Sequence, residues 1–223
     1  SQQDVSSSTI FGIERLFSAN IKQIGVIHRG FSSYSKSKYR NNPEWQIAIE
    51  LQNRFPDLPL ICDPSHIFGR RDLIHDVSQK ALDLNFDGLM IESHIDPDNA
   101  WSDAAQQITP AELIQLMKEL KLRKQSVNQE DYLKNLEKLR TKIDSADNDI
   151  LNILGKRMKI SDDIGKLKKK ENVAILQSKR WNEILGKMIL EGKERGLSEE
   201  FVLKIFKAIH QESINHQEKI LKG

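Results

Sequence analysis

Two different hydrophobic patterns divide the sequence. In the first half, uninterrupted apolar runs at 23–28, 58–63 and 87–93 alternate with amphipathic segments. Apolar runs without polar alternation are typical of parallel strands buried on both faces, and the segments between them are expected to form helices. This alternation predicts an α/β domain over residues 9–120, preceded by a polar tail at 1–8.

The second half has the period of a helix. Residues 132–168 contain no proline, and their apolar positions recur at helical spacing. We expect one helix of roughly 55 Å, at ~1.5 Å per residue, followed by shorter helices at about 178–193 and 198–221. A polar stretch without periodicity, 121–130, predicts a linker before this all-α domain, 131–223. Because two short helices cannot cover so long an apolar stripe, we also expect a partner chain.

Composition narrows the class of partner. The chain has 34 basic and 32 acidic residues, so its formal net charge of +2 gives no general attraction to nucleic acid. A single cysteine, Cys62, excludes an intrachain disulfide and suits a reducing compartment. No apolar run is long enough to cross a bilayer, and the first residues lack the apolar segment of a signal peptide. We therefore expect a cytoplasmic protein, with no membrane or nucleic-acid partner, that acts on small molecules.

Polar side chains follow each predicted strand at its carboxyl end. His28 and Arg29 follow the first strand, Asp63 and His66 the second, and Glu92 closes the third. Sites in α/β barrels and open α/β sheets are built at this edge. Each residue taken alone has a simpler explanation, since an Asp-Pro pair can be a turn and a loop histidine can be satisfied by its neighbours.

The segments around these strand ends resemble a known family. The run "CDPSH", preceded by "HRGF" and followed by "IESH" and "NAWSDAAQQ", is similar to the C-terminal half of a 3-deoxy-D-arabino-heptulosonate 7-phosphate (DAHP) synthase barrel. The resemblance implies a partial (β/α)8-type barrel over 9–120. It also implies that His66, Glu92 and Asp103 bind a divalent metal ion and that Arg29 binds the phosphate of phosphoenolpyruvate. Imidazole and carboxylate ligands suit manganese, iron or zinc, which would polarise an aldehyde for attack by an enol carbon.

Such a barrel needs eight βα units, and the pattern predicts only about three. The family's fourth metal ligand, a cysteine, its catalytic lysine and its Lys-Pro-Arg-Thr segment belong to earlier strands and have no counterpart in this sequence. Cys62 lies in the strand before His66 and does not replace that ligand. We therefore expect this chain alone not to make DAHP, and we expect a truncation, a proteolytic remnant or part of a longer protein. Arg70 and Arg71 either begin the next helix or bind a phosphate at the barrel mouth.

Seven polar residues of the helical half form a second candidate set: Arg140, Arg157, Lys168, Gln177, Arg180, Ser213 and Gln217. At ~100° per residue, the 11-residue spacing of Arg157 and Lys168 places both on one helix face. Ser213 and Gln217 share a face at i, i+4. Arg140 and Arg157 are 17 residues apart and point ~100° away from each other, so one straight helix does not aim both at one small molecule.

The order and spacing of this set resemble the all-helical chorismate mutase domain, in "LRTKID", "LGKRMKISDDIGKLKKK", "VAILQSKRW" and "IHQESINHQ". The resemblance implies a three-helix domain, an intertwined homodimer in which Arg140 reaches the partner's site, and conversion of chorismate to prephenate without a cofactor. The three arginines of the set and Ser213 would hold the substrate carboxylates, while Lys168 and Gln217 would donate hydrogen bonds to the ether oxygen. Where acidic residues often hold the substrate hydroxyl in this family, the chain has Gln177, which can accept a hydrogen bond, and Trp181, which cannot.

The two resemblances together imply a fusion of DAHP synthase with chorismate mutase in aromatic amino acid biosynthesis. One alternative is a complete bifunctional enzyme, acting on phosphoenolpyruvate and erythrose 4-phosphate as well, of which this chain is a part. Another is that the helices form a non-catalytic, prephenate-sensing dimerisation module that regulates DAHP synthase. Without the resemblance, the cations of the helical half would be interpreted as a solvated face.

Overall fold

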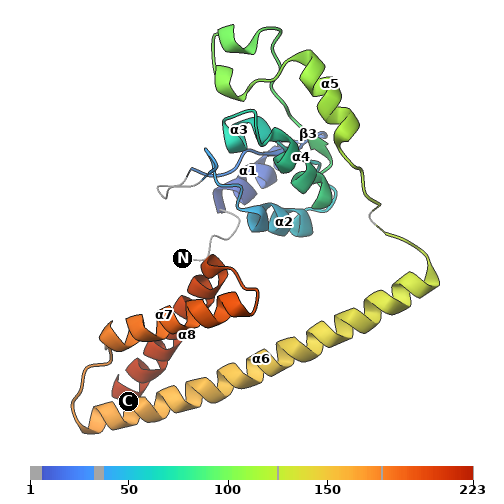
Figure 1. Ribbon diagram of the computed structural model, residues 1–223. Coiled ribbons are helices and arrows are strands. Elements are labelled where there is room, and N and C mark those ends of the chain that lie inside the picture. The colour runs from blue at the N-terminus through green and yellow to red at the C-terminus, as the bar shows by residue number, and fades with distance from the viewer. Residues whose placement is uncertain (1–6, 33–37, 125, 177, 223) are drawn as a thin grey trace. The chain divides into compact units, whose positions relative to one another are not determined.

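The computed structural model describes residues 7–32, 38–124, 126–176 and 178–222, and the chain divides into two compact units between Val127 and Asn128. The first unit is α/β and the second is all-α (Figure 1). Among the described residues, no helix is both long and apolar enough to cross a membrane.

The first unit is built on three parallel strands in the order β1-β2-β3. Its elements are α1 (Ser7–Ser18), β1 (Val26–His28), α2 (Trp45–Arg54), β2 (Leu60–Cys62), α3 (Pro64–Phe68), α4 (Ile74–Asp83), β3 (Gly88–Leu89), the 3-10 turns Pro97–Asn99 and Ala104–Gln106, and α5 (Pro110–Glu119). His28 pairs with Cys62, and Cys62 pairs with Leu89, so the carboxyl ends of the strands meet at one edge. All three strands are shorter than the apolar runs because ladder pairing covers only two or three residues of each run.

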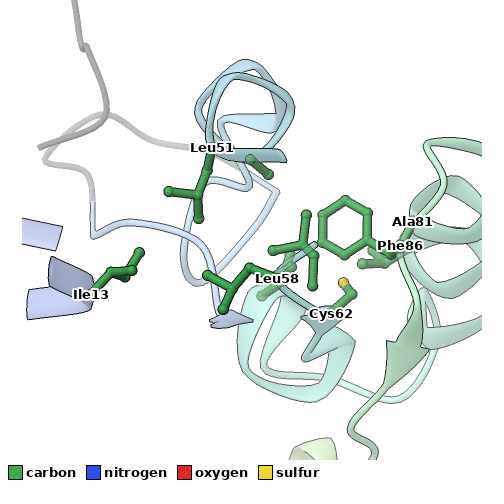
Figure 2. Packing of buried hydrophobic residues seen from close by; sticks show 10 residues of the cluster. Ile13, Leu51, Leu58, Cys62, Ala81 and Phe86 are labelled. Carbon is green, nitrogen blue, oxygen red and sulfur yellow. The ribbon is translucent and has the colours of Figure 1, made fainter. Parts of the chain in front are cut away.

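The core of this unit lies around β2, the central strand. Leu51 of α2, Cys62 of β2 and Ala81 of α4 are all buried, and Phe86 packs in the same cluster (Figure 2). Helices therefore cover the sheet, as expected for parallel strands that read as continuous apolar runs. Burial of Cys62 beside the Asp63 carboxylate raises the pKa of its thiol to about 12, so the thiol stays protonated in the core.

The second unit consists of α6 (Glu130–Lys170), α7 (Ser178–Glu194) and α8 (Glu199–Lys222). At ~1.5 Å per residue, α6 is about 60 Å long. Figure 1 shows α8 beside the C-terminal part of α6 only. The close packing there depends on Gly165, because a Cβ at this position would lie 3.2 Å from the Gln217 Cα.

The N-terminal part of α6 has an apolar stripe with little cover from its own unit. Leu139, Ile143, Ile150 and Ile153 are each at least half exposed. Within the described ranges, the only buried residues of α6 are Ser161 and Gly165, both near its contact with α8. The long helix expected from the sequence is therefore present, but most of its apolar stripe is not covered by α7 or α8.

Candidate functional site

Three potential metal ligands gather at the carboxyl edge of the sheet. His66 of α3, Glu92 after β3 and Asp103 in the following loop bring one ligand atom each within 4.8 Å of one another. The His66 Nε2 atom is 3.3 Å from Glu92 Oε1. The structure thus brings together all three residues that the resemblance implied as a set. One imidazole and two carboxylates are a donor set that fits manganese, iron or zinc.

The orientation of His66 is determined locally by Asp63. Asp63 caps α3, accepting a hydrogen bond from the His66 backbone N–H at 3.1 Å through Oδ1. Its Oδ2 lies 2.7 Å from His66 Nδ1, which leaves Nε2 facing the other two ligands. A carboxylate on the far nitrogen is the usual support of a metal-binding histidine. The predicted phosphate ligand Arg29 lies next to this group, with its Nε 3.4 Å from Asp63 Oδ2 and its side chain half exposed.

A second layer of polar side chains holds the two acidic residues. Gln106 is 1% exposed, and its amide nitrogen donates to Glu92 Oε2 at 2.9 Å. Arg40 donates to the Gln106 Oε1 atom at 2.9 Å and to Asp103 Oδ1 at 3.0 Å. Sequence reasoning missed both residues, because neither belongs to a predicted strand end and nothing local distinguishes Arg40.

The adjacent arginines of "GRRD" have separate roles. Arg71 donates to the carbonyls of Gln107 and Ala104 at 2.7 and 2.8 Å, so it holds the backbone of the loop that carries Asp103. Arg70 pairs with Asp72 at the surface, where this pairing raises the pKa of the guanidinium and lowers the pKa of the carboxyl. The guanidinium of Arg71 is therefore engaged in holding this loop and is not merely a surface charge at the start of a helix.

The helical unit contains a cavity of about 320 Å³ that opens between α6, α7 and α8. Five of the seven predicted residues line it: Arg157, Lys168, Arg180, Ser213 and Gln217. Arg140 is not among the lining residues, and its side chain is 64% exposed on the uncovered part of α6. Gln177 lies outside the described residues.

Hydrogen bonds between α6 and α8 order one wall of this cavity. Arg157 donates to the Ser213 hydroxyl, and burial lowers the pKa of its guanidinium, which stays a cation at neutral pH. Ser161 donates to the Ser213 carbonyl at 3.1 Å and accepts from Gln217 Nε2 at 3.2 Å. Because Ser161 already donates its hydroxyl proton, it can only accept from Gln217. The amide of Gln217 is therefore oriented with its nitrogen toward Ser161. On the other wall, Lys168 donates to the carbonyl of Ile175.

Two aromatic rings complete the described lining. The imidazole of His210 on α8 stacks on the indole of Trp181 on α7, with ring centroids 3.9 Å apart and an interplanar angle of 22°. Burial and the charge of Arg157 both lower the pKa of His210. Sequence reasoning did not identify His210, although its i, i+3 spacing from Ser213 places both on one helix face.

Comparisons with known proteins agree with this division. Residues 8–129 match the DAHP synthetase I family, and residues 139–218 match chorismate mutase type II. The first part is similar to phospho-2-dehydro-3-deoxyheptonate aldolase of Thermotoga maritima, at 35% identity over 106 residues, covering 46% of this chain and 30% of that protein. The second is similar to the bifunctional chorismate mutase/prephenate dehydratase of Buchnera aphidicola, at 32% identity over 83 residues, covering 37% of this chain and 22% of that protein.

Among solved structures, a truncated form of DAHP synthase from Thermotoga maritima is 28% identical, with a TM-score of 0.42, over 48% of this chain and 40% of that one. The crystal structure of the aldolase from the same organism is 27% identical, with a TM-score of 0.44, over 50% of this chain and 32% of that one. The chain spans less than a third of the length of the two curated relatives. The chain belongs to the DAHP synthetase I family through residues 8–129, and it carries a chorismate mutase type II region at residues 139–218.

Proposed function

We propose that the helical unit is a chorismate mutase, which converts chorismate to prephenate in the cytoplasm as part of a fusion with DAHP synthase. The observation that carries this proposal is the charge of the cavity. Its described lining includes the cations Arg157, Lys168 and Arg180 and no acidic side chain. A cavity of this kind suits a small dicarboxylate, and guanidinium groups bind carboxylates through paired hydrogen bonds.

The reaction needs positioning and electrostatic stabilisation rather than proton transfer. Chorismate rearranges through a chair-like pericyclic transition state, in which the breaking ether bond leaves negative charge on oxygen. Arg157 and Arg180 would hold the carboxylates, and the Ser213 hydroxyl helps to position Arg157. Lys168 and the second N–H of Gln217 would donate to the ether oxygen. Each such donor typically contributes about 10²- to 10³-fold to the rate.

A homodimer would complete the site. The apolar stripe at Leu139, Ile143, Ile150 and Ile153 is at least half exposed, and extended apolar patches of this kind usually mark protein contacts. We propose that a second copy of the chain covers this stripe. Arg140 lies on the same part of α6, so dimerisation would bring it to the partner's cavity as a further carboxylate ligand.

For the first unit, we propose a metal-dependent part of DAHP synthase. His66, Glu92 and Asp103 would hold a divalent ion, which supplies Lewis acidity to an aldehyde carbonyl when bound. Arg29 would bind the phosphate of phosphoenolpyruvate beside it. The condensation with erythrose 4-phosphate would require the remaining βα units of a complete barrel.

A matched pair of lysines tests the mutase proposal. Lys168 lines the cavity, whereas Lys166 on the same helix pairs with exposed Asp163 at 2.8 Å. In a chorismate-consumption assay, Lys168→Ala should lower kcat by about 100-fold or more, and Lys166→Ala should leave it unchanged. Equal rates for the two variants would remove Lys168 from the site. Prephenate binding without turnover would instead favour a regulatory module.

A further inference from the structure

The stacked pair of His210 and Trp181 presents an unoccupied imidazole edge in the wall of the cavity. The indole covers one face of the imidazole, so stacking limits how the ring can rotate. Within the part of the chain that the structure describes, neither ring nitrogen of His210 has a hydrogen-bond partner. The ring is therefore held in place without its hydrogen-bonding capacity being used.

The cations of the cavity cannot meet one requirement of a hydroxylated ligand. Arginine and lysine side chains only donate hydrogen bonds, so they cannot accept the proton of a ligand hydroxyl. The hydroxyl of Ser213 already donates to the Ile209 carbonyl and accepts from Arg157. The Ser161 hydroxyl is likewise used in both directions.

Two side-chain acceptors of the described lining have no hydrogen-bond partner there, and they differ in accessibility. The Gln217 Oε1 atom has no partner there, but it is buried beneath the surface of the cavity wall. His210 is only half buried. The cations that line the cavity with it, Arg157 and Lys168 from α6 and Arg180 from α7, disfavour a further positive charge. A neutral imidazole offers one nitrogen lone pair as an acceptor.

We propose that His210, held by its stack on Trp181, accepts a hydrogen bond from the ring hydroxyl of the cyclic dicarboxylate bound in this cavity. This inference rests on the proposed mutase function and identifies a specificity-determining residue for it. It gives the hydroxyl an acceptor in a chain that has a tryptophan at one of the two positions where acidic residues often serve. Trp181 acts through His210 as a positioning residue.

The test compares two substrates and three replacements of His210. Chorismate and a chorismate analogue that lacks the ring hydroxyl are assayed with His210→Ala, His210→Phe and His210→Gln. His210→Ala and His210→Phe should lower kcat/KM for chorismate by about tenfold or more and leave kcat/KM for the analogue unchanged. His210→Gln, which retains an acceptor, should recover much of the loss. His216 serves as the control, because it pairs with Asp162 and Glu212 and does not line the cavity.

The outcomes separate this inference from the mutase proposal. Equal losses on both substrates, or full rescue by His210→Phe, would show that the ring only packs and would overturn the inference. Unchanged kinetics in His210→Ala would overturn it as well. If the wild-type chain does not turn chorismate over, the mutase proposal fails. Calorimetric binding of chorismate and of the analogue then tests the role of His210 independently of turnover. A preference for the hydroxylated compound that disappears in His210→Ala supports the inference, and equal binding overturns it.

Discussion

Replacing Gly165 by alanine should separate the helices that form the cavity. A Cβ at this position would lie 3.2 Å from the Gln217 Cα and 3.3 Å from the Ile220 Cβ. Neither neighbour is the end of a flexible side chain, so α8 as a whole must move by a few tenths of an ångström. That movement displaces Gln217, which we expect to donate to the ether oxygen.

The expected change in the free energy of unfolding of Gly165→Ala follows from two opposing effects. In the interior of a helix, alanine stabilises the helical conformation by about 1 kcal/mol relative to glycine. Overpacking a close contact costs typically about 1–3 kcal/mol. Gly165→Ala should therefore lower the free energy of unfolding by about 0–2 kcal/mol. Gly186→Ala in α7 is the matched control, because its Cβ would have no heavy atom within 4 Å, and it should raise this free energy by up to about 1 kcal/mol.

Both effects can be measured on the same preparations. Urea unfolding followed by circular dichroism gives the free energies, at one protein concentration because association adds to apparent stability. Chorismate turnover should fall about tenfold or more in Gly165→Ala, reflecting a misplaced donor, and stay near the wild-type rate in Gly186→Ala. If Gly165→Ala is as stabilising as Gly186→Ala and retains full turnover, the packing of α6 on α8 described above is wrong.

Three further predictions follow from other parts of the chain. Mixing Arg140→Ala and Arg157→Ala chains should restore part of the turnover that each lacks alone, and inactive heterodimers would contradict a shared site. Burial among aromatic rings lowers the pKa of His28 below its ordinary 6.5. As the pH falls, the unfolded chain therefore binds a proton at this histidine before the folded chain does. The free energy of unfolding should be at its full value above about pH 6.5 and should decrease below it. The pH dependence of urea midpoints should be weaker in His28→Leu, and an identical pH dependence would refute this assignment. Asp63→Asn should weaken Mn²⁺ binding about 10- to 100-fold in calorimetry, because His66 loses its support, and unchanged affinity would place the ion elsewhere.

Local geometry explains which site residues the sequence could predict. Lys168 lies three turns from Arg157, and Gln217 lies one turn from Ser213, so helical spacing alone aligned each pair toward what proved to be one cavity. The stack of Trp181 on His210 depends on how α7 lies against α8. No spacing within one helix encodes that contact.

The strand ends of the first unit likewise include residues that the sequence could predict and residues that it could not. Polar residues after buried runs placed His66 and Glu92 at one edge of the sheet, because parallel strands bring their carboxyl ends together. The third member of the set, Asp103, was expected only from the resemblance to DAHP synthase. The support from Arg40 and Gln106 comes from loops, whose path depends on the assembled sheet. The length of β3 could not be predicted either, since strand pairing requires a neighbour and an apolar run does not specify where that neighbour ends.

The central claim is that the cationic cavity of the helical unit binds chorismate and accelerates its rearrangement. The most direct measurement is the rate at which the purified wild-type chain converts chorismate to prephenate, compared with the uncatalysed rate in the same buffer. The account predicts saturable turnover, orders of magnitude above the uncatalysed reaction and independent of added metal. Chorismate that disappears no faster with the protein than without it would contradict the claim.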